Sequence, residues 1–176
     1  MTLAVCPGSF DPITLGHLDV VRRAADMFDR VIVGVARNTS KSYLFTDEER
    51  VDLARAATAH LGAVDVQLVP GLLAQFCKDA GANAIVKGLR GGADVDAEQP
   101  MALMNRHISG VETVFVLGDP ALAHVASSLV KDVARYGGDV LDLVPEGVAH
   151  ALPTALRRAT AGIARPDSPR SPGVTA

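Results

Sequence analysis

Aromatic and sulfur-containing side chains are scarce in this sequence of 176 residues, which has no tryptophan and only two cysteines. The scarcity of aromatics argues against a base-stacking surface for single-stranded nucleic acid. The formal net charge is −3 and Lys and Arg form no basic run, so we expect no nucleic-acid partner. Cys6 and Cys77 lie among apolar residues with no Cys-x-x-Cys spacing, and we expect both to be buried free thiols.

Long hydrophobic runs are also missing. No apolar stretch approaches the ~20 residues that a membrane-spanning helix needs. The first residues, Met1–Pro7, have no basic segment and are more typical of a first strand than of a signal peptide. We therefore expect a cytoplasmic protein with no membrane association, long enough to bury a hydrophobic core.

Short apolar runs alternate regularly with amphipathic stretches. The apolar runs have the length and composition of strands and are Leu3–Cys6, Val31–Ala36, Val64–Val69, Ala84–Lys87 and Thr113–Leu117. Such near-continuous hydrophobicity is typical of parallel strands covered on both faces. The alternation predicts an α/β fold with a doubly wound five-stranded parallel sheet, in which the ligand lies at the carboxyl ends of the strands.

The intervening helices are predicted from apolar residues spaced by three and four. They are expected around Leu18–Phe28, after a Thr46–Glu49 capping box, around Leu72–Cys77, over Ala97–His107, from Ser127 to before Gly137, and from Glu146 to about Ala159. Pro100 is tolerable only near the first turn of its helix. Residues 1–160 are predicted to form one domain, and the proline-rich residues 161–176 a disordered tail.

The junction between the first strand and the first helix is the most informative place. Thr14 caps a helix whose first turn contains Gly16 and His17, where free backbone N–H groups and the helix dipole favour a bound phosphate. The His17 imidazole and the Ser9 hydroxyl are candidate donors to it. The tetrapeptide Thr-x-Gly-His alone can occur by chance with Thr14 only capping, but Pro-Gly-Ser-Phe-Asp-Pro before it favours the phosphate site.

Further phosphate-binding side chains are expected at the same edge of the sheet. Lys41 follows the second strand and Arg90 the fourth, whereas Ser127 and Ser128 begin a helix. Each has an ordinary alternative, which is a solvated lysine, a surface ion pair or a plain helix cap.

These segments together resemble one enzyme family. Cys6–His17 resembles the (H/T)xGH motif of the nucleotidyltransferase superfamily and, in detail, the phosphopantetheine adenylyltransferases. The resemblance covers about residues 3–160 and continues in Asn38–Lys41, Phe45–Arg50, Lys87–Arg90, Met104–His107 and Ser127–Lys131. It implies a Rossmann-like nucleotidyltransferase fold and transfer of the adenylyl group of ATP to 4′-phosphopantetheine, giving dephospho-coenzyme A and pyrophosphate.

The resemblance also implies roles for particular residues. Catalytic residues would be His17, Lys41 and Arg90, and substrate-binding residues Ser9, Lys41, Leu73 and Lys87. ATP-binding residues would be Ser9, Phe10, His17, Gly88, Leu89, Arg90, Glu98, Leu122, Ala123, His124, Val125, Ala126, Ser127 and Ser128. Mg²⁺ would be held mainly by ATP oxygens and water, without protein ligands. A homohexamer and feedback by coenzyme A are further implications.

Two segments depart from the family pattern. Asp94–Glu98 keeps its terminal acids but lacks two aromatics and the middle glutamate, and Leu122–Ala126 lacks two aromatics and a serine. Two other functions therefore remain open. One is a weakened or non-catalytic nucleotide or coenzyme A binder on the same fold. The other is a sister nucleotidyltransferase with a different phosphate acceptor.

Overall fold

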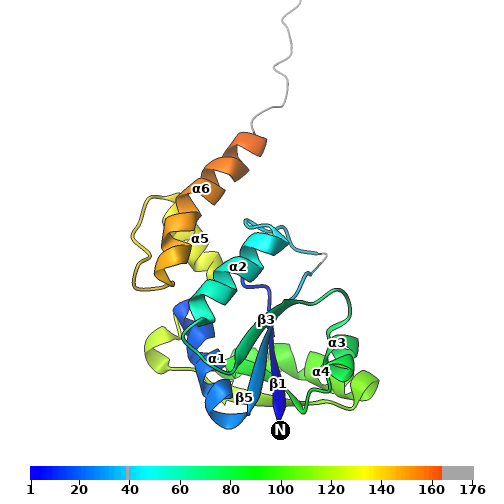
Figure 1. The fold of residues 1–176 in the computed structure, drawn as a ribbon. Helices are drawn as coiled ribbons and strands as arrows, with labels where there is room; N and C mark the ends of the chain where they lie inside the picture. The colour runs from blue at the N-terminus through cyan, green and yellow to red at the C-terminus, as the bar shows by residue number, and fades with distance from the viewer. Residues whose placement is uncertain (39, 164–176) are drawn as a thin grey trace, which may run out of the picture.

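The computed structural model describes residues 1–38 and 40–163, which are built around one parallel sheet (Figure 1). The strand order is β3-β2-β1-β4-β5, and the strands are β1 (Leu3–Gly8), β2 (Arg30–Val35), β3 (Val64–Leu68), β4 (Ala84–Leu89) and β5 (Glu112–Leu117). All four neighbouring pairs are parallel. The predicted α/β fold with five parallel strands is confirmed.

Helices cover both faces of the sheet. Successive side chains of a strand point to opposite faces, so the apolar side chains on each face need a helix layer to bury them. Ala4 and Cys6 of β1 face a core shared with α1 (Leu15–Met27) and α2 (Asp47–Thr58). Val5 faces the opposite core, which is shared with α3 (Leu73–Asp79). Because both faces are buried, the strands show the near-continuous hydrophobicity that made them recognisable.

The two cysteines are free and buried, as expected. Removal from water raises the pKa of Cys6 to about 12 and that of Cys77 to about 11. Both thiols therefore stay protonated near neutral pH and act as small apolar side chains.

Two capping boxes fix the starts of the first two helices. Thr14 and Thr46 are the N-caps, and each side chain accepts a hydrogen bond from the backbone N–H three residues later. Glu49 returns the bond in α2, as the sequence predicted, whereas His17 takes that place in α1. The first helix therefore begins with an imidazole locked into its first turn.

Some predicted boundaries were too short. β1 continues through Pro7 and Gly8, which pair with Gly34 and Val35 of β2. Its pairing with β4 joins only Ala4 to Ala84 and Val5 to Ile85. Pro7 is tolerated because its missing N–H lies beyond the part of β1 that pairs with β4. β1 and β4 therefore separate at their carboxyl ends, where the strand order switches and a ligand site is expected.

The fourth helix, α4 (Gly92–Ser109), differs most from its prediction. It begins well before Ala97, so Pro100 lies inside the helix and not in its first turn, as the sequence reasoning required. Pro100 and Asp96 are exposed. Pro100 has no N–H to donate to the Asp96 carbonyl, and the exposure of both residues makes this interruption tolerable, because water can replace the missing donor.

The last helices lie at the end of the molecule opposite the N-terminus (Figure 1). After a short 3-10 turn, Pro120–Leu122, come α5 (Ser127–Arg135) and α6 (Glu146–Ile163). α6 runs past the predicted boundary at residue 160, so the expected division between domain and tail falls inside a helix. The rest of the predicted tail, residues 164–176, lies outside the described residues.

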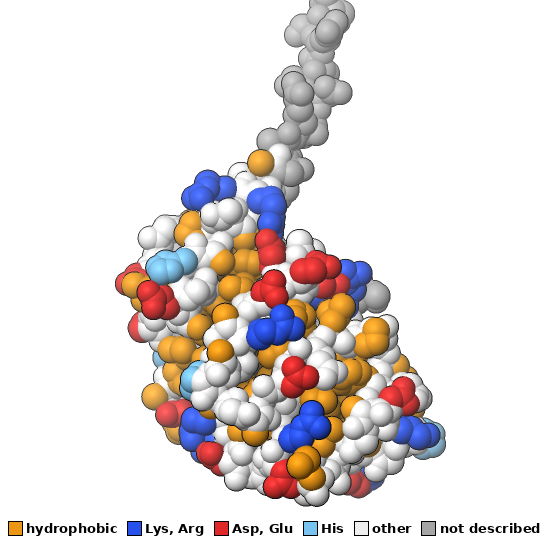
Figure 2. Space-filling model, viewed as in Figure 1, with side chains coloured by type: hydrophobic (Ala, Val, Ile, Leu, Met, Phe, Trp, Pro, Cys, Tyr) orange, Lys and Arg blue, Asp and Glu red, His pale blue; other side chains and the backbone are white. Residues whose placement is uncertain are grey.

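Lys and Arg side chains are interspersed with Asp and Glu over the face drawn in Figure 2. Within residues 1–38 and 40–163, no helix is both long and apolar enough to cross a membrane.

Candidate active site

A cavity of about 550 Å³ opens where β1 and β4 separate. It is bounded by the loop after β1, the first turn of α1, the loop containing Lys41, the end of β4 and the start of α5. Its lining contains the cations Lys41, Lys87, Arg90 and Lys131 and the acids Asp11, Asp94, Glu98 and Asp119. This mixture suits a polyanionic ligand that competes with carboxylates for the same cations.

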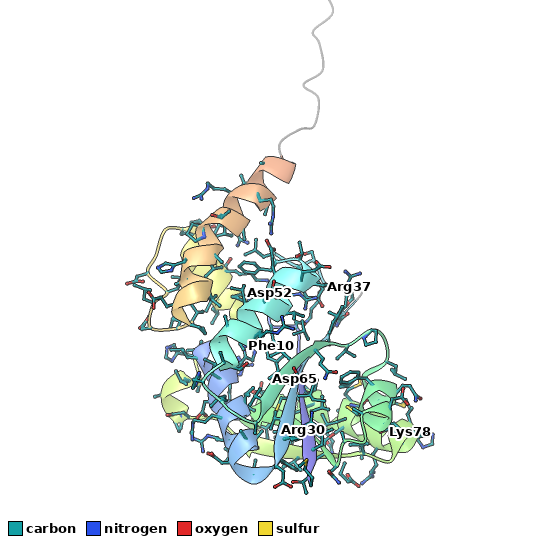
Figure 3. The ribbon with its side chains drawn as sticks, viewed as in Figure 1. Phe10, Arg30, Arg37, Asp52, Asp65 and Lys78 are labelled. Carbon is teal, nitrogen blue, oxygen red and sulfur yellow. The ribbon has the colours of Figure 1, made fainter. Side chains whose placement is uncertain are left out.

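The loop after β1 is held in an unusual conformation. Phe10 is buried with a φ of 47°, and a Cβ at Gly8 would come within 2.8 Å of its ring. The ring meets the His17 imidazole edge to face, with their centroids 5.1 Å apart. Phe10, labelled in Figure 3, lies near the middle of the view between α2 and the strands. Phe10 therefore packs against His17, and it also belongs to the lining of the cavity in which the family resemblance places ATP.

His17 is oriented by its own N-cap. The backbone N–H of Thr14 donates to Nδ1 at 3.0 Å, which assigns the proton of the neutral ring to Nε2. Removal from water, followed by the positive charges of Arg90 and Lys87, lowers the pKa of His17 to about 4. At neutral pH the imidazole is therefore an uncharged donor in the cavity.

Two cations at the end of β4 are paired with acids of α4. Lys87 Nζ lies 3.1 Å from Glu98, and Arg90 binds Asp94 through both Nε and an Nη at 3.1 Å. The hydrogen bonds between Arg90 and Asp94 raise the pKa of Arg90 and lower the pKa of Asp94. Both terminal acids of the divergent 94–98 segment thus contact the cations predicted to bind phosphate.

The loop that carries Lys41 is held to the loop after β1 through contacts of the Tyr43 side chain. The Tyr43 hydroxyl accepts a hydrogen bond from the Asn38 N–H at 2.6 Å and lies 3.5 Å from the Ser9 hydroxyl. Arg50 is fully buried beneath, 4.2 Å from the Tyr43 ring, and donates to the Ser9 carbonyl. Lys41 itself is exposed at the cavity rim.

The start of α5 is fastened to the loop after β1. Ser127 donates from its hydroxyl to the Pro12 carbonyl at 2.8 Å. One turn later, Lys131 donates to Asp11 at 2.6 Å. Because Ala126 is the N-cap and has no polar side chain, the first N–H groups of α5 are left for a ligand in the cavity.

Most of the residues that the family resemblance singled out meet in this cavity. Its lining includes Ser9, Phe10, His17, Lys41, Lys87, Gly88, Leu89, Arg90, Glu98, Leu122, Val125, Ala126, Ser127 and Ser128. Ala123 and His124 are not part of the lining. Leu73 lies instead in a neighbouring hollow of about 20 Å³ with Lys87, Glu98 and Asn105. Gly88 has a packing role as well, since a Cβ there would come within 2.4 Å of Val20.

The sequence predictions left out several polar residues of the lining, among them Asp11, Tyr43 and Lys131. Asp11 belongs to the recognised motif, but an aspartate before proline is common in turns, and nothing in the sequence marks its partners. Lys131 was visible only as part of a matching segment. Lys131 follows Ser127 by four residues and therefore lies on the same face of the helix. This spacing was the signal that could have placed it in the cavity.

No group of three or more His, Cys, Asp or Glu within residues 1–38 and 40–163 is arranged to hold a metal ion. Asp11, Asp94 and Glu98 are each engaged by a cation. This donor set fits a Mg²⁺ ion that arrives on a triphosphate and keeps water and phosphate oxygens as its ligands.

Comparison with known proteins agrees with this geometry. A family model described as cytidylyltransferase-like matches residues 5–133. The phosphopantetheine adenylyltransferase of Micrococcus luteus is 52% identical over 153 residues, or 86% of this chain and 98% of that protein. Proteins of the same name from Nocardioides sp. and Streptomyces coelicolor are 54% and 53% identical, each over 89% of this chain and 98% and 99% of their own lengths.

The fold has a counterpart of known structure. A Vibrio parahaemolyticus protein, to which nicotinate-nucleotide adenylyltransferase activity has been ascribed, matches with a TM-score of 0.66 at 17% identity, over 90% of this chain and 96% of that one. At this identity the match establishes the Rossmann-like fold alone. The family model and the relatives, each more than half identical over nearly its whole length, show that this chain belongs to the phosphopantetheine adenylyltransferase family of nucleotidyltransferases.

Proposed function

We propose that this chain transfers the adenylyl group of ATP to 4′-phosphopantetheine, giving dephospho-coenzyme A and pyrophosphate. The observation that carries the proposal is one cavity, at the switch in strand order, that gathers Ser9, His17, Lys41, Lys87, Arg90, Ser127 and Ser128. The relatives that share half of its sequence bear the name of this activity.

The chemistry needs positioning more than proton transfer. An oxygen of the pantetheine phosphate attacks the α-phosphorus of ATP, a new P–O bond forms, and the bond from the α-phosphorus to the bridging oxygen of pyrophosphate breaks. Because the attacking phosphate is already anionic, no general base is required. A neutral His17 with a pKa of about 4 suits this reaction, since its Nε2–H can donate to an α-phosphoryl oxygen without itself titrating near pH 7.

The cations divide between the two substrates. Lys41 and Lys87 orient the attacking phosphate, and Arg90 holds the leaving pyrophosphate together with the N-terminus of α5 at Ser127 and Ser128. Phosphate oxygens replace Glu98 on Lys87 and Asp94 on Arg90. Mg²⁺ enters as part of the ATP substrate and neutralises charge on its phosphates.

The pantetheine arm extends from Lys87 toward Leu73. Lys87 borders both the main cavity and the small hollow that contains Leu73 and Asn105. A phosphate at Lys87 would lead the attached arm toward this hollow, where Leu73 and Met101 offer apolar contacts, which supports the substrate-binding role proposed for Leu73.

Assembly, regulation and location complete the proposal. Met101, Leu103 and Met104 of α4 and Leu117 of the edge strand β5 are exposed, which supports contact between copies in a homohexamer. Coenzyme A contains the product nucleotide and is proposed as a feedback ligand. The two free, buried thiols support a cytoplasmic location.

The test is pyrophosphate release from MgATP with and without 4′-phosphopantetheine. We expect release by the wild type only with both substrates, and a loss of about 100-fold or more in His17→Ala. His60→Ala is the matched control, because His60 is exposed and outside the cavity lining. Binding of ATP or coenzyme A by the wild type without any release would instead support a non-catalytic binder.

A further inference from the structure

Asp11 is a buried carboxylate at the meeting point of three segments. Its side chain is 5% exposed and lies in the loop after β1, next to Phe10. It accepts hydrogen bonds from the backbone N–H groups of Leu44 at 3.0 Å and Phe45 at 2.9 Å, which follow Lys41 in the chain. It also accepts the 2.6 Å bond from Lys131 of α5.

Each of these segments supplies groups to the proposed reaction. The loop after β1 carries Ser9, the loop before α2 carries Lys41, and α5 presents Ser127 and Ser128. Asp11 and Lys131 are 120 residues apart in the sequence, so their contact fixes the distance between the β1 loop and α5. The Ser127 bond to Pro12 is a second tie between the same two segments.

We propose that Asp11 and Lys131 form a positioning pair, which rests on the proposed function and sets the separation of the Lys41 loop and the α5 N-terminus along the line of adenylyl transfer. In this role neither side chain binds a substrate phosphate. A displacement of either segment by about 1 Å is enough to lower the rate of such a reaction by around 100-fold.

The exposure of the pair argues against Lys131 as a phosphate ligand. Glu98 and Asp94, the partners of Lys87 and Arg90, are 32% and 24% exposed at their side chains, so water can solvate them when a phosphate takes their cation. The Asp11 side chain is 5% exposed and is held by two backbone N–H groups. Moving Lys131 to a phosphate would leave a buried carboxylate without its cation, which is strongly unfavourable.

The test uses steady-state kinetics of the full-length enzyme with MgATP and 4′-phosphopantetheine. The variants are Lys131→Met, Asp11→Asn and the double variant, in which both charges are removed together and the fold is least disturbed. Arg135→Met is the control, because it removes an exposed cation from the same helix. We expect kcat to fall about 10- to 100-fold in both single variants, with each KM changed less than about threefold.

The double variant supplies the decisive comparison. Because the two side chains act as a unit, the kcat of the double variant should be no lower than the kcat of the slower of the two single variants. The proposal would be overturned if the fold-loss of kcat in the double variant equalled the product of the two single losses. A raised KM for ATP in Lys131→Met, with kcat unchanged, would overturn it as well. Should Asp11→Asn fail to fold, the kcat and KM values of Lys131→Met decide alone. A wild type without turnover would refute the proposed function, whereas an active wild type with unaffected variants would refute only the positioning pair.

Discussion

The two sides of the cavity hold their charges differently. On the α4 side, Lys87 and Arg90 are paired with acids whose side chains are 32% and 24% exposed. On the α5 side, Lys131 is paired with Asp11, whose side chain is 5% exposed and bonded to two backbone N–H groups. The same kind of ion pair is thus exchangeable on one side and fixed on the other.

This difference separates binding from alignment. Cations on the α4 side can exchange a carboxylate for a phosphate with little loss, because water then solvates the carboxylate that has lost its cation. The α5 side cannot do so and instead keeps the loop after β1 and the loop before α2 in register with the helix. The site therefore combines a rigid frame with two cations, Lys87 and Arg90, that are free to exchange their carboxylate partners for phosphate.

The largest effect expected from this comparison is on stability. Asp11→Ala leaves Lys131 and the backbone N–H groups of Leu44 and Phe45 without their partner, and we expect the free energy of unfolding to fall by about 3–5 kcal/mol. Chemical denaturation of the wild type and the variant measures it. A change below about 1 kcal/mol would show that the pair is not part of the frame.

Removing a cation from the exchangeable side should affect catalysis instead. Arg90→Ala is expected to lower kcat/KM for ATP about 100-fold, because a donor to the triphosphate is lost. The free energy of unfolding should change by less than about 1 kcal/mol, since its pair with Asp94 is half exposed. Kinetics and denaturation of one preparation give both values, and a large loss of stability with normal kinetics would reverse the assignment of the two sides.

His17 lies between the two sides and links stability to pH. Its pKa is lowered from 6.5 to about 4 in the folded protein, so between these values the unfolded chain binds a proton that the folded chain does not. Stability from this group is complete above about pH 6.5 and falls as the pH is lowered toward 4, by about 1–3 kcal/mol. Denaturation of the wild type and His17→Gln across this range isolates the contribution. Parallel curves would mean that His17 titrates normally.

The smallest effect is expected on the affinity for ATP when Asp94, the carboxylate paired with Arg90, is neutralised. Asp94→Asn removes the charge that competes for Arg90, and we expect ATP to bind up to about threefold more tightly with stability nearly unchanged. Titration calorimetry with MgATP measures the affinity. Weaker binding by Asp94→Asn would show that Asp94 orients Arg90 for the triphosphate and does not compete with it.

The sequence predicted those parts of the molecule that depend on local chemistry. The strands followed from their buried apolar runs, and Thr14 and Thr46 were recognisable as caps. The edge of the sheet at which the cavity opens followed from parallel topology. The extent of α4 did not, because Pro100 argued for a later start and its exposed position, which makes it tolerable, is a tertiary property.

Long-range contacts account for what the sequence left out of the site. Asp11 and Lys131 meet across 120 residues, and no spacing rule joins them. The gap between β1 and β4 depends on where their pairing stops, which apolar runs do not reveal. Residue identities therefore predicted which groups would bind phosphate but not which groups would hold them in place.

The most direct test of the account is single-turnover formation of dephospho-coenzyme A from MgATP and 4′-phosphopantetheine, with enzyme in excess and both substrates saturating. The wild type should form product, and His17→Ala should form it about 100-fold or more slowly, because the donor to the α-phosphoryl oxygen is gone. Equal rates for the two proteins, or no product from the wild type, would contradict the account.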